Sequence, residues 1–424
     1  MTTRLAIACV MLVAVPVGGR AQTPRSWSEI RNQFQATNPT LQAGRIGIDE
    51  ARAAEITAFL RPNPQWSMTL DQIGNTDQGN AFSASTLGAF VSYLHERDHK
   101  RELRRDSAVG ATTVTTSTQA DLERTLLFTL RIAFVQVLQA KAFRALAQEN
   151  LESYDQVLRL SGYRFQSGDI SRMDLDRLQL QRVTYESDAQ TADVNLRTAK
   201  IQLLRLLNDQ TMPVEQFDVE GPFDFIPPST SLEDVRRIAL ERRPDLQAAV
   251  QATAKARTDH QLAVANGSAD PTITVDAGFP VVSQVFQSFQ PPLREFVGVG
   301  MTIPLRLFDR NQGEKLRTEL DVTRIEHLAD AARMQVFSDV DTAYTSVVSG
   351  VALLQPYKAT YLDQAARVRD TVTYSYERGG ASLLDFLQSQ QEYRAVRLSY
   401  VNLIAAYLNA AAQLNLAVGQ EVIQ

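Results

Sequence analysis

Residues 163–174 read YRFQSGDISRMD, and residues 374–385 read YSYERGGASLLD. Tyrosine, glycine, serine and aspartate recur at the same spacing in the two stretches, 211 positions apart. In each stretch, a glycine that can end one helix precedes a serine that can begin the next. The aspartate follows three positions after the serine, where a negative charge suits the helix dipole. Each stretch therefore predicts the turn of a helical hairpin.

The rest of the chain also contains an internal repeat. Residues 38–43 match residues 243–248, and residues 64–71 correspond to residues 271–278, at offsets of 205 and 207. Such a long period indicates two copies of one unit rather than a solenoid. We therefore predict a first repeat, a proline-rich linker, a second repeat and a short tail, at residues 22–208, 209–230, 231–418 and 419–424.

Long helices dominate each predicted repeat. Between residues 126 and 158, nine of ten heptad positions are apolar, and Arg144 is the exception. Heptads of this length predict coiled-coil packing. A helix over residues 100–166 would be roughly 100 Å long. The expected long helices cover residues 100–166, 171–208, 310–376 and 382–418, and a shorter helix opens each repeat at residues 39–61 and 244–266.

Two strands per repeat precede the long helices. Apolar residues alternate with small or polar ones, as in Trp66, Met68 and Leu70. This alternation is typical of strands that face lipid around a wet lumen, and equally of half-buried strands in a soluble sheet. The predicted strands lie at residues 64–73, 81–94, 271–280 and 294–306.

Residues 1–21 have the design of a secretory signal peptide. Arg4 precedes an apolar stretch at Leu5–Val17, which is short for a membrane-spanning helix. Cleavage after Ala21 would remove two arginines and the only cysteine, Cys9, and would change the net charge from −5 to −7. Only four apolar residues precede Cys9, so we do not expect lipid attachment there. No later segment has 18 consecutive apolar residues, so we do not expect a helical membrane protein.

The composition and motifs argue against several functions. The mildly acidic chain lacks the basic surface of a nucleic-acid binder. No Ser-His-Asp set, phosphate loop or HExxH motif is present, so we expect no enzyme and no cofactor. His95 and His99 have i, i+4 spacing and could share a helical face. Without a third ligand at suitable spacing, a solvated polar collar is the favoured interpretation of that pair, and we predict no metal site.

Four strands cannot close a barrel, because about eight are needed even for an interior filled by side chains. Three copies of the chain would provide twelve strands, and their helical hairpins would form a closed tube. We therefore expect a mainly α protein with a small β part, assembled as a homotrimer with a pore on its threefold axis.

The sequence resembles the TolC family of outer-membrane efflux proteins over nearly its whole mature length. The resemblance rests on Arg243-Pro244-Asp245, on the two turn stretches, and on residues 303–305 (IPL) followed by residues 307–314 (LFDRNQGE). That last run is similar to the cation-efflux branch of the family. The corresponding first-half run at residues 96–101 is less typical, and the chain lacks the lipid-attachment cysteine of many relatives in that branch.

This resemblance implies a trimeric duct in the outer membrane that extends into the periplasm. It implies three kinds of partner besides the other two protomers: outer-membrane lipid, a periplasmic adaptor (membrane fusion) protein, and an inner-membrane pump of the RND type. The expected cargo is metal cations. The same duct could instead serve organic drugs or secreted polypeptides. A soluble periplasmic coiled-coil scaffold is the alternative from another class.

The resemblance also assigns candidate site residues. Asp174 and Asp385 match positions where family members place acidic residues near the periplasmic end of the tunnel, so they are expected to constrict the pore. Helix capping explains the same two residues equally well. The neighbouring turn residues are expected to contact the adaptor, although ordinary turn chemistry also accounts for them: Gly168, Ser171, Gly379 and Ser382.

Overall fold

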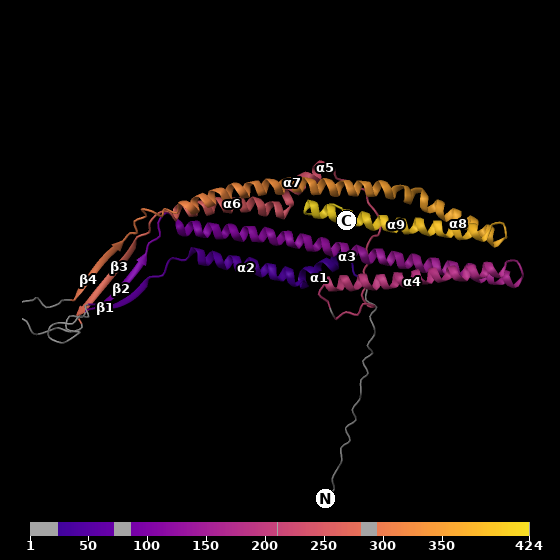
Figure 1. Cartoon of the computed structure of the whole chain (residues 1–424), viewed down its shortest axis with the longest axis horizontal. Helices are drawn as coiled ribbons and strands as arrows, with labels where there is room; N and C mark the ends of the chain where they lie inside the picture. Colours follow the sequence, from indigo (N-terminus) through magenta and orange to yellow (C-terminus); the bar gives the residue numbers. More distant parts are fainter. Residues whose placement is uncertain (1–23, 72–85, 210, 281–294, 424) are drawn as a thin grey trace, which may run out of the picture. The chain divides into compact units, whose positions relative to one another are not determined.

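The computed structural model describes residues 24–71, 86–209, 211–280 and 295–423. The predicted signal peptide, residues 1–21, lies outside the described residues. So do the outer ends of three predicted strands, at residues 72–73, 81–85 and 294. The described chain is mostly helical with one small sheet, which confirms the predicted fold class (Figure 1).

The chain divides into two compact units, and each unit combines segments of both predicted repeats. The hairpin unit contains the chain up to Asn38, Leu130–Phe225 and Leu354–Ala405. The sheet unit contains Pro39–Thr129, Ile226–Leu353 and the chain from Ala406 onward. The compact units do not coincide with the sequence repeats, because long helices such as α3 contribute residues to both units.

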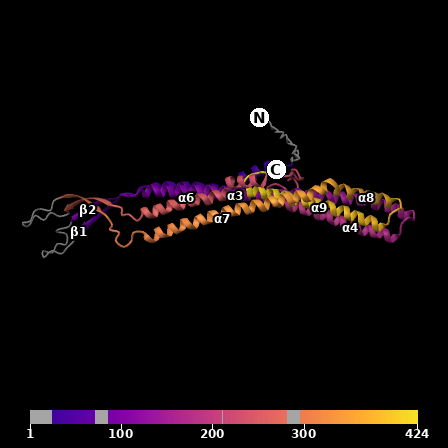
Figure 2. The same cartoon turned by 90° about the horizontal axis from the view of Figure 1, so that it is seen from above.

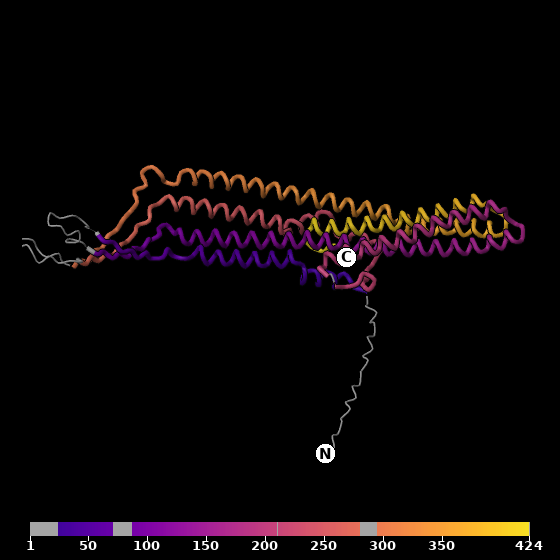
Figure 3. The backbone as a smooth tube through the Cα atoms, turned by 60° about the horizontal axis from the view of Figure 1, so that its bottom comes forward, coloured from indigo at the N-terminus to yellow at the C-terminus, as the bar shows by residue number. Residues whose placement is uncertain are grey.

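The hairpin unit contains two helical hairpins that lie side by side (Figures 2 and 3). The end of α3 turns into α4, and α8 turns into α9. The short helix α1 also belongs to this unit. The bounds of these helices are α1 Trp27–Thr37, α3 Lys100–Gln166, α4 Arg172–Leu206, α8 Leu362–Glu377 and α9 Leu383–Val418.

Heptad packing holds the hairpins together. Helix α4 buries one residue every seven positions at Leu178, Tyr185, Ala192 and Ala199. A second buried row on the same helix contains Leu175, Leu196 and Leu203. Two rows offset by three or four positions form the seam of a coiled coil. Arg144, the polar exception in the predicted heptads, lies with its Nε 3.1 Å from Oδ1 of Asp193 on α4.

The predicted long helix over residues 310–376 is divided by a π-helical turn after Pro356. Helix α7 (Gln312–Pro356) is followed by the π-helical turn η1 (Tyr357–Tyr361), and α8 begins only after it. Pro356 has no N–H to donate, and its ring clashes with the carbonyl of the preceding turn. A wider π turn accommodates such an interruption without ending the helical path. Lys358 in this turn forms an ion pair with Asp224 of the linker.

The sheet unit contains helices α2 (Pro39–Phe59), α5 (Leu232–Arg242) and α6 (Pro244–Ala265), together with most of α7. Its four strands form one antiparallel sheet in the order β1-β2-β3-β4 (Figure 1). The strands are β1 Gln65–Asp71, β2 Thr86–Leu94, β3 Thr272–Pro280 and β4 Phe296–Thr302. The central pair, β2 and β3, joins the two repeats.

The register places the predicted apolar residues on one face of the sheet. Trp66 pairs with Val91, Val91 with Val275, and Val275 with Val299. Directly paired residues point to the same side, so these four form one row across the sheet. All four are exposed, up to 78% for Val299. The opposite row contains Ser67, Phe90, Asp276 and Gly298. The chain therefore presents a continuous apolar sheet face that nothing in the described protomer covers.

Two described helices, α3 and α9, are long and apolar enough to cross a membrane by length and composition alone. Core helices of soluble proteins reach the same hydropathy, and 56% of the relevant stretch of α9 is buried. The hydropathy of α9 is therefore explained by its packing.

Arg243 fixes the end of α9 in the sheet unit. Its side chain is only 4% exposed and lies between two carboxylates, with Nη2 2.5 Å from Asp245 and Nη1 2.8 Å from Asp339. Nη1 also donates to the carbonyl of Ala417 at 3.3 Å. Burial alone would raise the pKa of Asp245, but the hydrogen bonds and charge of Arg243 hold it below its usual value. The buried charge is thus compensated on three sides.

We predict that Arg243→Ala loosens the C-terminal end of α9. The substitution leaves Asp245 and Asp339 without their buried partner, which costs about 3–5 kcal/mol in comparable sites. Hydrogen exchange of the amides at residues 406–418 should accelerate accordingly. The exposed neighbour Arg242 is the control, and Arg242→Ala should leave the exchange unchanged. Equal exchange in both variants would contradict the anchoring role of Arg243.

Candidate functional site

The predicted site residues lie at the two turns of the hairpin unit. The first turn joins α3 to α4, and the second joins α8 to α9. Gly168 has a φ of +84° and Gly379 a φ of +77°, a conformation that glycine adopts without strain. The amide of Asp169 donates to the carbonyl of Arg164 at 2.8 Å, and the amide of Gly380 donates to that of Ser375 at 2.8 Å. Both turns thus use glycine to end a helix, as predicted.

Ser171 and Ser382 cap the helices that follow. Ser171 Oγ accepts the amide hydrogen of Asp174 at 3.1 Å, and Ser382 Oγ accepts that of Asp385 at 3.2 Å. Each hydroxyl also donates to the carboxylate, at 2.8 Å in the first turn and 2.7 Å in the second. In the second turn, the Ser382 amide donates to Asp385 Oδ2 at 3.2 Å. The capping interpretation of both aspartates is therefore confirmed.

The two carboxylates remain available to solvent. Asp174 is half-buried and Asp385 is exposed. Hydrogen bonds from Ser382 lower the pKa of Asp385 below its usual value, so this carboxyl is ionised at neutral pH. Among the described residues, no hydrogen bond or ion pair joins Asp174 to Asp385. Within one protomer, the aspartates are two separate negative charges at the tips of two hairpins.

Aromatic packing holds the two tips together. The Tyr376 and Phe386 rings stack at 4.9 Å within the second hairpin, and Tyr154 stacks on Tyr185 at 4.6 Å within the first. Arg164 Nη1 then donates to the carbonyl of Tyr376 at 2.8 Å and so links the first hairpin to the second. Its guanidinium also lies 5.2 Å from the centre of the Tyr376 ring. The two turns are therefore presented by one packed cluster.

Two exposed apolar residues at the tips were not predicted as site residues from the sequence. Met173 and Leu384 are both exposed, and each directly precedes one of the two aspartates. They also lie 211 positions apart, the same offset as the two turn stretches, so the repeat would have identified them as an equivalent pair. Together with the exposed Tyr163 and Tyr374, they give each tip an apolar surface beside its carboxylate.

The histidine pair does not form a site. Helix α3 begins at Lys100, and His99 has a φ of 55°, so His95 and His99 do not share a helical face. No group of three or more histidine, cysteine, aspartate or glutamate residues in the described ranges could hold a metal ion.

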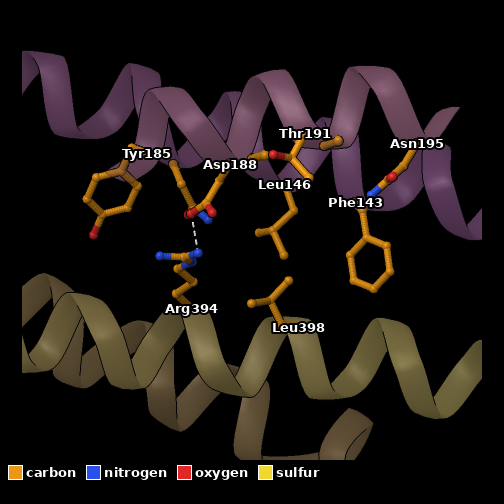
Figure 4. Close-up of a pocket in the computed structure, with 11 residues that line it drawn as sticks. Phe143, Leu146, Tyr185, Asp188, Thr191, Asn195, Arg394 and Leu398 are labelled. Atoms are coloured by element: carbon orange, nitrogen blue, oxygen red, sulfur yellow. Dashed lines mark hydrogen bonds and ion pairs between the residues drawn. The ribbon is translucent and has the colours of Figure 1, made fainter. Parts of the chain in front are cut away.

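A cavity of about 230 Å³ lies away from the turns, between α3, α4 and α9 (Figure 4). Phe143, Leu146 and Leu398 line it together with the ion pair between Asp188 and Arg394. This ion pair links α4 to α9, so its groups already have partners. None of the predicted site residues lines this cavity.

Comparisons with known proteins agree with this architecture. The sequence profile described as outer membrane efflux protein matches residues 235–420. The chain is 26% identical over 356 residues to the pyoverdine export outer membrane protein OpmQ of Pseudomonas aeruginosa, covering 82% of this chain and 72% of OpmQ. It is 23% identical over 413 residues to the cobalt-zinc-cadmium resistance protein CzcC of Cupriavidus metallidurans, covering 96% of this chain and 93% of CzcC.

Solved structures show the same fold. The outer-membrane channel OprN superposes with a TM-score of 0.77 at 15% identity, over 93% of this chain and 90% of OprN. CusC superposes with a TM-score of 0.74 at 17% identity, over 93% of this chain and 92% of CusC.

We predict that the cap on α9 persists into acid. Because the folded pKa of Asp385 is depressed, its contribution is complete above the unfolded pKa and is lost only as pH falls through the lower folded value. Exchange of the amides at residues 383–386, corrected for the intrinsic rate, should therefore stay slow until the pH drops below the usual aspartate range. Ser382→Ala should accelerate this exchange at neutral pH, since losing a cap serine costs ~1 kcal/mol. A Ser382→Ala variant with unchanged exchange would refute the cap.

Proposed function

We propose that the chain is a member of the family of outer membrane efflux proteins, whose profile matches residues 235–420, and that it is the exit duct of a tripartite system that exports metal cations. The protein resides in the outer membrane and reaches into the periplasm, and it is a passive channel rather than an enzyme. In the proposed system, an inner-membrane pump of the RND type supplies the energy. A periplasmic adaptor connects that pump to the tips of the hairpins, at Gly168, Ser171, Gly379 and Ser382.

The proposed duct is a trimer. The sheet ends in two unpaired edges, β1 and β4, and a backbone edge cannot remain unpaired in lipid. Pairing β4 of one protomer with β1 of the next would close twelve strands into a barrel. Helix α4 supports the same assembly, because it exposes a further heptad row, separate from the two buried rows described above. The row contains Met173, Leu180, Val194 and Ile201, which a neighbouring copy would cover.

Cation selectivity rests on one observation, the pair of carboxylates at the two tips. In a trimer, Asp174 and Asp385 would contribute six negative charges near the threefold axis. Rings of carboxylates favour cations in channels. The near-complete coverage of CzcC is consistent with this cargo. Carboxylates alone hold transition metals weakly compared with thiolates or imidazoles, as a duct that must release its cargo requires.

We predict that Asp174→Asn with Asp385→Asn weakens the block of single-channel conductance by multivalent cations in planar bilayers. The amide keeps the oxygen that the cap uses but removes six charges from the trimer, so block by trivalent or divalent cations should weaken about tenfold, equivalent to 1.4 kcal/mol. Asp176→Asn is the control, because that carboxylate is already paired with Arg172 at 2.9 Å. Unchanged block in a folded double variant would leave the aspartates with a capping role only.

A second candidate cargo is pyoverdine or a similar compound. The chain is slightly more similar in identity to OpmQ, whose name assigns it to pyoverdine export, than to CzcC. The duct has no energy source of its own in the proposed system, so the pump would select the cargo and the tip carboxylates would only tune passage.

Deleting the gene in its native host separates the two cargoes. If the cargo is metal, the deletion strain should become several-fold more sensitive to cobalt, zinc or cadmium salts and should accumulate the metal. Its secretion of pyoverdine-like compounds should not change. Complementation with the intact gene provides the control. Normal metal tolerance, combined with retention of pyoverdine-like compounds in the periplasm, would overturn the metal assignment in favour of the second candidate.

A further inference from the structure

The connection between β4 and α7 exposes an unusual run of apolar side chains. Leu305 is 79% exposed, Leu307 64% and Phe308 91%. Single exposed apolar residues are common on protein surfaces, but a contiguous cluster marks a contact with a partner or a membrane. Phe308 is also more exposed than the apolar residues of the sheet face named above.

This run follows the apolar residues of β4 in the sequence. Every second residue of β4 is apolar and exposed at Val297, Val299 and Met301. Ile303, Leu305 and Leu307 continue the alternation in the sequence past Thr302, where the strand ends, and all three are exposed. The connection therefore adds exposed apolar side chains directly next to the end of the strand.

Two arginines interrupt the apolar run. Arg306 and Arg310 form no ion pair with any residue in the described ranges, although the charge of Arg306 acts electrostatically on the carboxylate of Asp270. Arg310 donates from Nε to the carbonyl of Arg306 at 3.2 Å, which leaves its terminal N–H groups free for another acceptor. A planar guanidinium beside exposed apolar residues suits the phosphate groups of lipid heads.

The turn itself does not require these residues. Asn311 ends the connection with a φ of 60°, and its side-chain amide donates to the carbonyl of Ala263 at 2.7 Å. His99 holds the same place in the first repeat, with a φ of 55°, but the residues before it are polar. There Glu96 pairs with Arg104, and the amide of Arg97 donates to Asp270 at 2.9 Å. The first connection is also shorter, at residues 95–99 against 303–311, and Asp98 has a positive φ there as well as His99. The apolar run is therefore a feature of the second connection alone.

We propose that residues 303–310 are a lipid-contact segment at the membrane surface nearer the helices. Leu305, Leu307 and Phe308 insert among the acyl chains, and Arg306 and Arg310 bind phosphate groups of the lipid heads. The segment thereby sets the depth at which the protein sits in the bilayer. This inference rests on the proposed function, in which the apolar sheet face contacts lipid.

Site-specific fluorescence in nanodiscs tests the segment. With Cys9→Ser removing the only cysteine, an NBD label is placed by Leu307→Cys in the full assembled protein. His95→Cys is the matched control, because it is exposed at the equivalent place of the first repeat. Val299→Cys on the sheet face is the reference for membrane insertion. Doxyl-labelled phosphatidylcholine quenches from the lipid phase, and iodide quenches from water.

The proposal predicts lipid quenching at positions 299 and 307 and iodide quenching at position 95. Lipid quenching at 299 without lipid quenching at 307 would overturn the segment while leaving the proposed function intact. A label at 307 that neither quencher reaches would mean that a second copy covers the run, which also overturns it. Absence of lipid quenching at both positions would instead contradict the membrane-embedded sheet of the proposed function.

The arginines are tested in the Leu307→Cys background. Doxyl-labelled phosphatidylglycerol should quench more strongly than doxyl-labelled phosphatidylcholine, since basic residues near a membrane surface attract anionic lipid. Arg306→Gln with Arg310→Gln should lower this preference several-fold, toward equal quenching. A preference that survives the double substitution would show that these arginines do not bind the lipid phosphates.

Discussion

A backbone hydrogen-bonding group in lipid must find a partner within the protein, and this constraint governs the sheet unit. One protomer supplies four strands with an exposed apolar face and two unpaired edges. Such an apolar face is stable in lipid, and such edges are not. In the proposed membrane-embedded duct, the apolar row from Trp66 to Val299 and the edges of β1 and β4 are two parts of one requirement, which an assembly of several copies would satisfy.

The hairpin unit follows a different rule. Its helices stay together through heptad rows such as Leu178, Tyr185 and Ala192, and through links such as Arg164 to Tyr376. At the turns, local capping chemistry places Asp174 and Asp385 at the tips. The proposed transport role uses the same charges, so it does not compete with the capping role. The proposed cation preference needs no dedicated metal site, since free carboxylates near the axis suffice.

Much of this arrangement could be predicted from the sequence, because it follows from local rules. Alternation along the strands placed Val275 and Val299 on one face, and the serine-aspartate spacing predicted both caps. The failures came from effects that local patterns do not contain. The heptad pattern does not reveal the π turn after Pro356, because this turn depends on how the backbone accommodates the N–H group that proline lacks. The i, i+4 spacing of His95 and His99 predicts a shared face only inside a helix, and the turn at His99 prevents that. The exposure of Met173, Leu384 and Phe308 depends on which surfaces the fold leaves uncovered.

Each compact unit combines segments of both repeats, and this arrangement depends on tertiary contacts that the repeat pattern alone does not specify.

Both edges of the described sheet in one protomer lack a partner strand, and we propose that three copies pair these edges with one another. Native mass spectrometry of the protein released from nanodiscs tests this assembly directly. Leu180→Glu with Val194→Glu, on the exposed heptad row of α4, is the perturbation, and the exposed Gln179→Glu with Gln202→Glu is the control. We expect a trimer for the wild type and the control, and dissociation for the α4 variant. A folded, membrane-inserted monomer of the wild type would contradict the proposed trimer.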